Sequence, residues 1–183
     1  MISEPYWINE VLSFWFDELD EADWFSGDAR VDQEIHRRFL ALHLQLVATD
    51  AAGIREPRAL LAAVIVLDQF SRNLFRGDLR AYASDPIARR LARHAIDAGY
   101  DQPLPPRQRL FLYLPFEHSE SVEHQALAVD LISGLHNAGW TSFAQLHKDL
   151  IDKFGRFPGR NVALGRQSTP EEVAALQAPN AGF

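Results

Sequence analysis

The residues best suited to chemistry in this sequence include a group of arginines near its carboxyl end. Residues 154–166 contain Arg156, Arg160 and Arg166 and no acidic residue, although the formal net charge of the chain is −7. Arg156 and Arg160 form a candidate fork for a phosphate or a carboxylate, because each guanidinium presents a rigid set of N–H donors. In the alternative interpretation, the arginines bind the last carbonyls of the preceding helix and pair with acids of neighbouring helices.

A second candidate group combines glutamate and histidine. It comprises Glu117, His118, Glu120 and His124, and His147 is a further candidate from a later helix. Glu120 and His124 lie four residues apart and share a helical face, as do ligands of metal sites in helix bundles. The sequence lacks an HExxH motif and the Glu-x-x-His spacing of di-iron carboxylate proteins. We therefore expect a capping or hydrogen-bonding role, with no metal and no cofactor.

A third group follows the most apolar stretch of the chain. Asp68, Arg72 and Arg76 are spaced by four residues and so lie along one stripe of a helix. Charges on a buried helix must be paired or must face a cavity. Two interpretations follow, a structural network of ion pairs and the wall of a ligand cleft.

Composition excludes several classes of function. The sequence of 183 residues has no cysteine, so disulfides, thiolate nucleophiles and cysteine–zinc sites are excluded. The acidic balance argues against general nucleic-acid binding. The longest apolar run, residues 59–67, is far shorter than the roughly 20 residues of a membrane-spanning helix. The first residues lack the basic segment of a signal peptide, so we expect a cytoplasmic protein without a membrane anchor.

Helical periodicity with start and stop signals continues along the whole sequence. We expect helices at about residues 5–19, 28–48, 57–75, 85–98, 105–115, 119–137, 141–154 and from 169 onward. The helix at 57–75 is apolar all round over residues 60–67, which predicts a central buried helix. The stripe of the helix at 28–48 is expected to be Val31, Ile35, Phe39, Leu42 and Leu46.

Capping signals set several of the expected boundaries. Asp85 before Pro86 predicts a helix start, and Ser142 with Gln145 fits a capping box. Thr169-Pro170-Glu171-Glu172 combines a cap, a first-turn proline and a capping-box glutamate. Pro115 is expected to kink or end its helix, and Gly139 and Gly155 to end theirs.

These elements predict one all-α domain over residues 1–183. Short links between the helices favour antiparallel pairs. Two arrangements remain open, a right-handed superhelix similar to tetratricopeptide-repeat proteins and an irregular bundle of about eight helices. No repeat with the usual 34-residue markers is visible.

Three segments resemble a known family. They are LDQFSRNLFRG at 67–77, YLPFEHSESVEHQ at 113–125 and FGRFPGRNVALGR at 154–166. The chain is similar over nearly its whole length to a widespread bacterial family catalogued as domain of unknown function nine-two-four. The resemblance implies an all-α fold similar to tetratricopeptide-repeat proteins and no established activity. The family pattern commonly has histidine after the proline of FGRFP, where this chain has Gly159.

The sequence supports a function only at the level of a class. The leading hypothesis is a binding module with a polar cleft for an anionic small molecule or a peptide carboxylate, or a protein partner, in an unknown oligomeric state. The candidate ligand-binding residues are Asp68, Arg72, Arg76, Glu117, His118, Glu120, His147, Arg156 and Arg160. The alternative is an enzyme that uses His118 or Glu120 as the base and the arginines to stabilise charge. In a third hypothesis the same residues form a buried polar network that only fixes the packing of the helices.

Overall fold

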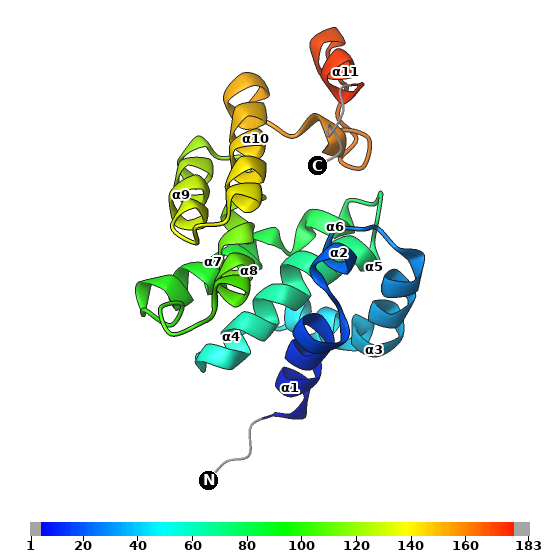
Figure 1. Cartoon of the computed structure of the whole chain (residues 1–183). Helices are drawn as coiled ribbons and strands as arrows, with labels where there is room; N and C mark the ends of the chain where they lie inside the picture. Colours follow the sequence, from blue (N-terminus) through cyan, green and yellow to red (C-terminus); the bar gives the residue numbers. More distant parts are fainter. Residues whose placement is uncertain (1–4, 178–183) are drawn as a thin grey trace. The chain divides into compact units, whose positions relative to one another are not determined.

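The computed structural model describes residues 5–177, and these are helical with no strand among them (Figure 1). The all-α prediction is therefore confirmed, whereas the superhelical arrangement stays a prediction. The chain divides into two compact units. The first comprises Met1–Arg76 with Arg80–Leu112, and the second comprises Gly77–Leu79 with Tyr113–Phe183. The single domain expected from the sequence stays a prediction.

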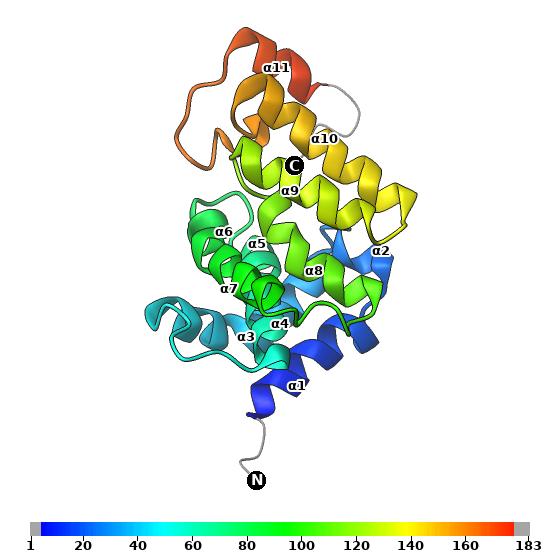
Figure 2. The same ribbon diagram turned by 90° about the vertical axis from the view of Figure 1, so that its left-hand side faces the viewer.

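The first unit is built around one buried helical segment. That segment consists of α4 (Pro57–Val64), the π-helical turn η2 (Ile65–Phe70) and α5 (Ser71–Leu74). Every residue from Ala59 to Phe70 is buried, which confirms the central helix predicted from the apolar run. The segment packs against α1 (Tyr6–Ser13), α3 (Ala29–Ala48) and α7 (Asp85–Asp97), as Figures 1 and 2 show. The remaining elements of this unit are the π-helical turn η1 (Phe14–Glu18), the short helices α2 (Glu21–Trp24) and α6 (Arg80–Ala83), and the first part of α8 (Pro106–Glu117).

Aromatic side chains fill the space between these helices. Trp15 contacts Phe70 and Phe111 edge to face at centroid distances of 5.4 Å. The indole of Trp24 stacks on that of Trp15 and donates its Nε1–H to the Trp15 carbonyl at 2.8 Å. This bond satisfies a polar group that would otherwise be costly to bury. The core of this unit thus combines aromatic side chains from several elements with the aliphatic side chains of α4.

The π-helical turns were not foreseen from the sequence. Both lie inside segments that the periodicity predicted as plain helices, Phe14–Glu18 within 5–19 and Ile65–Phe70 within 57–75. The carbonyl of Leu67 belongs to the second turn. It accepts hydrogen bonds from the hydroxyls of Ser71 and Ser84, at 2.9 and 2.6 Å. Side chains therefore bind a buried carbonyl at a place where the ordinary helical ladder changes register.

One position of the α3 stripe differs from the prediction. His43 is buried, whereas Leu42 is only half-buried. His43 lies four residues after Phe39 and three before Leu46, whereas Leu42 lies three after and four before, so spacing suits both residues and the packing decides between them. Burial lowers the pKa of the His43 imidazole below its usual value, because the charged form loses solvation.

The second unit contains the end of α8, then α9 (Val122–Ser133), α10 (Ala138–Phe154), the 3₁₀ turn η3 (Pro158–Arg160) and α11 (Pro170–Leu176). Helices α9 and α10 lie side by side along their lengths (Figures 1 and 2). Pro115 lies within α8, which continues to Glu117. Of the two predicted effects of Pro115, an end of the helix does not occur, and the His118 N–H still bonds the Leu114 carbonyl at 2.8 Å. A kink stays a prediction.

Caps explain where the helices of the second unit begin and end. The capping box of Thr169 and Glu172 at α11 is confirmed. The predicted start at Ser142 is wrong, because Asn137 caps α10 through a bond from the Trp140 N–H and places Gly139 within the first turn. Gly155 ends α10 with φ of 69°, a left-handed conformation that glycine adopts without steric cost. The first unit shows a similar correction, because Asp85 lies inside α7 and its carboxylate binds Arg72.

None of the helices in the described part of the chain is both long enough and apolar enough to span a membrane.

Candidate functional site

Three of the residues predicted as site candidates converge in the second unit. One donor atom each from Glu117, His118 and His147 lies within 4.8 Å of the other two. Glu117 and His147 are buried and His118 is half-buried. Glu117 and His118 sit where α8 ends, and His147 lies in the middle of α10. We call these three residues the Glu-His-His cluster.

The orientation of the His147 ring is fixed by its own helix. Its Nδ1 lies 2.9 Å from the carbonyl oxygen of Phe143, one turn earlier, and 3.3 Å from Oε1 of Glu117. Since a carbonyl oxygen only accepts, Nδ1 must carry the proton, and the lone pair of the neutral ring is then on Nε2. The ring edge also packs against Phe157 at a centroid distance of 5.5 Å. The His118 ring lies 6.1 Å from the His147 ring.

Hydrogen bonds to the main chain hold the other two cluster residues. The side-chain amide of Gln125, which is fully buried on α9, donates to the carbonyls of Glu117 and Ser119 at 2.5 and 2.7 Å. Arg160 donates to the carbonyl of His118 at 2.9 Å. The turn between α8 and α9 is therefore fixed at three consecutive carbonyls, and both ligand-type side chains of this turn leave from a fixed backbone.

Arg166 and Glu120 join two of the three segments that resemble the family. The Glu120 carboxylate accepts two bonds from the Arg166 guanidinium, at 2.7 and 2.9 Å, and one from the Phe157 N–H at 2.8 Å. Arg166 also donates to the carbonyl of Phe157 at 3.1 Å. Phe157 is fully buried, and the guanidinium of Arg160 lies 4.3 Å above its ring. The loop after α10 is thereby bound to the turn between α8 and α9.

Arg156 pairs with the last helix. Its Nε and one terminal nitrogen donate to the two carboxylate oxygens of Glu172, at 2.6 and 2.9 Å. Buried Asn161 donates to the same carboxylate at 3.2 Å and accepts from Arg166 at 2.9 Å. Glu172 is thus both the capping-box residue of α11 and the partner of Arg156. We call the residues that bind the loop through these contacts the arginine network, and they are Glu120, Arg156, Phe157, Arg160, Asn161, Arg166 and Glu172.

The third candidate group belongs to the first unit. Arg72 donates to both carboxylate oxygens of Asp85, at 3.0 and 3.1 Å, and lies 3.5 Å from the carboxylate of fully buried Asp68. These two carboxylates raise the pKa of Arg72, although burial alone would lower it. Arg76 makes a two-bond pair with Asp32, at 2.9 and 3.1 Å. This arrangement favours the ion-pair interpretation of Asp68, Arg72 and Arg76.

The nine predicted site residues therefore fall into separate groups. Asp68, Arg72 and Arg76 are in the first unit, and Glu117, His118, Glu120, His147, Arg156 and Arg160 are in the second. Among the histidines and acidic residues that the structure describes, Glu117, His118 and His147 bring donor atoms within 4.8 Å of one another. A cleft that all nine share stays a prediction.

Comparisons with known proteins assign the chain to a family. A family model described as a bacterial protein of unknown function (DUF924) matches residues 11–180. The chain belongs to the DUF924 family. It is also similar to the solved structure of a protein of unknown function, ATU0120, from Agrobacterium tumefaciens, with 38% sequence identity and a TM-score of 0.87. That similarity covers 93% of this chain and 96% of the other. No curated protein matches the sequence.

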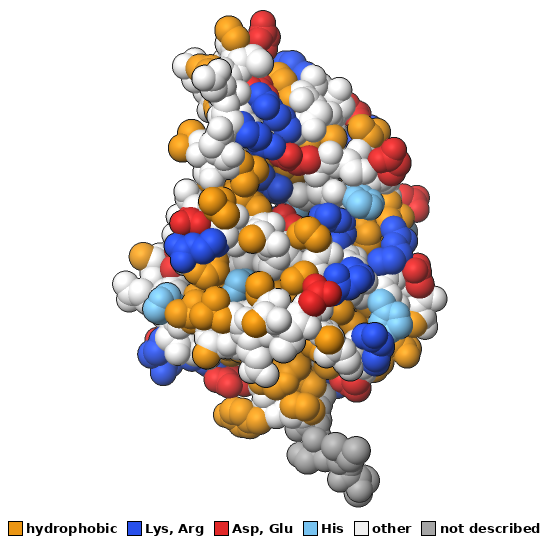
Figure 3. Space-filling model, turned by 180° about the vertical axis from the view of Figure 1, so that it is seen from behind, with side chains coloured by type: hydrophobic (Ala, Val, Ile, Leu, Met, Phe, Trp, Pro, Cys, Tyr) orange, Lys and Arg blue, Asp and Glu red, His pale blue; other side chains and the backbone are white. Residues whose placement is uncertain are grey.

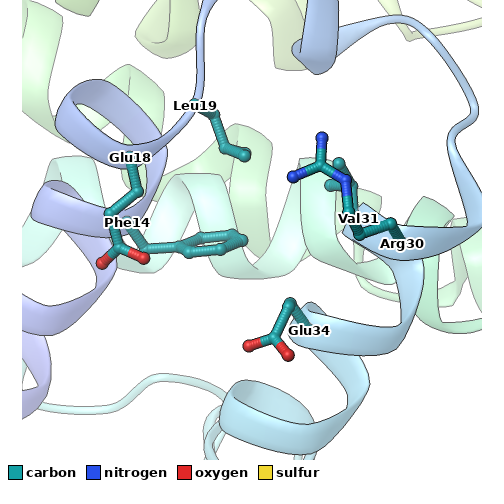
Figure 4. A pocket seen from close by; sticks show the side chains of 6 residues that line it. All are labelled: Phe14, Glu18, Leu19, Arg30, Val31 and Glu34. Carbon is teal, nitrogen blue, oxygen red and sulfur yellow. The ribbon is translucent and has the colours of Figure 1, made fainter.

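A hollow on this DUF924 chain is lined by none of the predicted residues. It has a volume of about 200 Å³, is lined by Phe14, Glu18, Leu19, Arg30, Val31 and Glu34, and belongs to the first unit (Figure 4). Ligand pockets usually measure about 300–1,000 Å³. Its charged lining is already paired, since Glu34 binds Arg37 at 2.7 Å and Glu18 binds Arg38 at 2.7 Å. The hollow is therefore a weaker candidate than the Glu-His-His cluster.

Sequence reasoning missed the residues that position the cluster. Gln125, Asn161 and Glu172 are buried polar side chains, and none was singled out as part of a site. A usable signal existed for Gln125, which falls on the inward face of the helix predicted at 119–137, next to Ala128 and Ile132. A buried amide among apolar residues must bind a polar group, and here that group is the turn holding Glu117 and His118.

The surface agrees with arginines that are paired rather than free to bind anions. On the face seen in Figure 3, acidic side chains lie near several of the basic ones. Burial alone would raise the pKa of Glu120, but bonds from Arg166 and the Phe157 N–H outweigh it and lower the pKa. Arg156, with the Thr169 N–H, lowers the pKa of Glu172 to about 2.

These pKa shifts predict how acid affects stability. A carboxylate with a lowered pKa stabilises the fold above its unfolded pKa, and this contribution is lost as pH falls through the folded pKa. For Glu172 the window runs from about 4.5 down to about 2. We expect urea midpoints to decline in this range, and Glu172→Gln to be less stable at pH 7 but to lose less on acidification. Glu171→Gln, at the exposed neighbouring position, should follow the wild type. Parallel declines for wild type and Glu172→Gln would contradict this account.

Proposed function

We propose that this chain binds a small molecule bearing a carboxylate or a phosphate, and that the site is the Glu-His-His cluster. The observation that carries the proposal is the convergence of three donor groups within 4.8 Å at buried and half-buried positions. Perturbed or concentrated titratable groups on a rigid frame are a common sign of a functional site. The anionic ligand expected from the sequence is kept, while the position of its site is changed.

The arginine network supports this site as a scaffold. Arg156 and Arg166 each use two guanidinium nitrogens on one carboxylate, and Arg160 is buried against Phe157. An anion would have to displace Glu172 or Glu120 to use these arginines as a fork. Arg160 and Phe157, in contrast, touch the cluster residues His118 and His147.

Charge balance sets a condition on the ligand. The Glu117 carboxylate repels a bare anion, so an imidazolium or a bound cation must accompany an anionic ligand in the cluster. Both imidazoles are close enough to supply such a group. The proposed site thus differs from an arginine fork in needing a balancing positive charge beside Glu117.

A thermal-shift screen tests the proposal. Purified protein is melted with phosphate, nucleotides and small carboxylates, beside His118→Gln and Arg156→Ala. At a ligand concentration of about 100 Kd, binding adds about 2.7 kcal/mol and should raise Tm by about 5–10 °C. The shift should vanish in His118→Gln and persist in Arg156→Ala even if that variant melts earlier.

The reverse pattern would place the site at the arginine loop. Loss of the shift in a folded Arg156→Ala variant, with the shift retained in His118→Gln, contradicts the proposed site. If no anion stabilises the protein, either without or with an added divalent metal ion, the proposed function itself is contradicted.

One observation also favours an enzyme. The Glu117 carboxylate faces the protonated Nδ1 of His147 at 3.3 Å, and a carboxylate in this position orients an imidazole whose Nε2 then acts as a general base. Glu120 is a weaker candidate base, because its lowered pKa makes it a poor proton acceptor near neutral pH. Any ligand found in the screen should be recovered after incubation, since chemical change that is lost in His147→Gln would indicate an enzyme.

A further inference from the structure

We propose that the Glu-His-His cluster is a binding site for a divalent transition-metal ion of the zinc type. The inference rests on the proposed function, and it names the cation that balances Glu117. It departs from the sequence-based expectation of no metal. That expectation followed from spacing along one helix, whereas the three donors come from two elements far apart in the sequence, the end of α8 and the middle of α10.

The donor set is the first argument. Two imidazole nitrogens and one carboxylate oxygen form the protein ligands of many catalytic zinc sites, with metal–ligand distances of about 2.0–2.2 Å. Tetrahedral geometry then places ligand atoms about 3.4 Å apart. The donors of Glu117, His118 and His147 lie within 4.8 Å of each other, and the three side chains would have to close further around an ion to reach ligand distance.

The surroundings of His147 are the second argument. A ligating histidine almost always donates its other ring N–H to a carbonyl or a carboxylate, which fixes the tautomer. His147 Nδ1 does this toward the Phe143 carbonyl at 2.9 Å. In the neutral ring, the lone pair that can bind an ion is therefore on Nε2. The Phe157 ring packs against the imidazole and makes one side of the site apolar.

The fixed backbone is the third argument. Gln125 and Arg160 bind the carbonyls of Glu117, His118 and Ser119, so the two neighbouring donors are held before any ion arrives. Holding ligands in place reduces the entropy lost when the ion binds. The buried side chains of Gln125 and Arg160 thus hold the turn between α8 and α9 more firmly than a connecting turn without a ligand would require.

The nature of the ion follows from the donors. Calcium takes six to eight oxygen ligands and magnesium prefers oxygen in octahedral geometry, and the cluster offers one carboxylate. Imidazole suits zinc, copper, iron and nickel. With neutral imidazoles, the cluster carries a charge of about −1, and a divalent ion changes this to about +1 with a coordination position open. An anionic ligand would then bind to the ion without any contribution from an arginine.

A metal titration of the full chain tests the proposal. Chelator-treated protein is titrated with Zn²⁺ by calorimetry and with Co²⁺ by visible absorption, beside Glu117→Gln, His118→Gln and His147→Gln. The wild type should bind one equivalent, with the absorption of a tetrahedral cobalt site. Each substitution should weaken binding by about 100-fold or more, because even residues in the second coordination sphere typically account for 10–100-fold.

Controls separate loss of binding from loss of fold. His36→Gln removes an exposed histidine of α3 and should bind Zn²⁺ as the wild type does. Circular dichroism shows which variants are folded, and half-buried His118 is the position least expected to disturb the core. A wild type that binds no Zn²⁺ overturns the proposal, and so does a folded His118→Gln variant with wild-type affinity.

The same samples distinguish this inference from the proposed function. Phosphate and acetate are titrated into metal-free and zinc-loaded protein. Anion binding that depends on His118 in a protein that does not bind zinc would overturn the metal site and keep the proposed function. If the protein binds one equivalent of zinc but neither its metal-free nor its zinc-loaded form binds phosphate or acetate, the metal site is kept and the proposed anion binding is overturned. Anion binding only to zinc-loaded protein is the expected result.

Discussion

Arg72→Met should lower the free energy of unfolding by about 3–5 kcal/mol, because it breaks a buried ion pair from one side. Arg72 donates to both oxygens of Asp85 and to the main-chain carbonyl of Asp68 at 2.5 Å. Asp68 and Asp85 are 0% and 6% exposed, so their carboxylates would remain in the core with the compensating cation removed. Urea unfolding followed by circular dichroism measures the change.

The matched control for this prediction is Arg37→Met. Arg37 pairs with Glu34 at 2.7 Å on the exposed face of α3, where the two side chains are 68% and 44% exposed. Exposed pairs of this kind contribute little to stability, because water and salt screen the two charges. Adding Asp85→Asn to Arg72→Met should restore part of the lost stability, since it removes one of the two carboxylates. Equal losses for Arg72→Met and Arg37→Met would show that the pair in the core is not a structural ion pair.

The fold was predictable from sequence where local chemistry decides it. The starts of α3 and α11 follow from Asp28 and Thr169, whose side chains accept from the first turn. The end of α10 follows from Gly155. These signals act within four residues and need no knowledge of the rest of the chain. The central helix was equally clear, because a run that is apolar all round can only be buried.

Other boundaries depended on packing that the sequence does not display. Asn137 and Ser142 are both good caps, and the choice of Asn137 adds a turn to α10 that packs beside α9. The sequence around Asp85 also predicts a helix cap. In the fold, however, the Asp85 carboxylate binds Arg72, which lies 13 residues earlier in the sequence. The π-helical turns carry no distinct composition, since an apolar run suits an α-helix and a π-helix alike.

The candidate site was predictable as a set of residues and not as an arrangement. Glu117, His118 and His147 were identified by type, but nothing in their spacing shows that they meet. The arginines were also found, whereas their partners depend on tertiary structure, with Glu120 lying 46 residues before Arg166. Arginines in an ion pair and arginines in a ligand site look alike in a sequence. The positions of Glu120 and Glu172, which pair with Arg166 and Arg156, are what favour the arginine network.

Glu120→Ala should lower the free energy of unfolding by about 2–3 kcal/mol, the second large effect. The Glu120 carboxylate is the acceptor for the Phe157 N–H and for two nitrogens of Arg166. Removing it leaves a main-chain donor and a guanidinium partly buried without this acceptor, and an unsatisfied buried group costs about 1–3 kcal/mol. Thermal melting should show a Tm lower by about 5–10 °C. A base or ligand residue facing an open site would cost far less stability when truncated.

Two comparisons make this prediction specific. Glu123→Ala, three residues later on the exposed face of α9, removes a carboxylate that accepts from the Ser121 hydroxyl and should leave stability close to that of the wild type. Glu120→Gln keeps one acceptor oxygen, so its loss of stability should lie between those of Glu120→Ala and Glu123→Ala. Because Phe157 packs against His147, folded Glu120→Ala should also bind Zn²⁺ more weakly than the wild type although it changes no ligand. Wild-type stability with weakened binding would instead place Glu120 in the site itself.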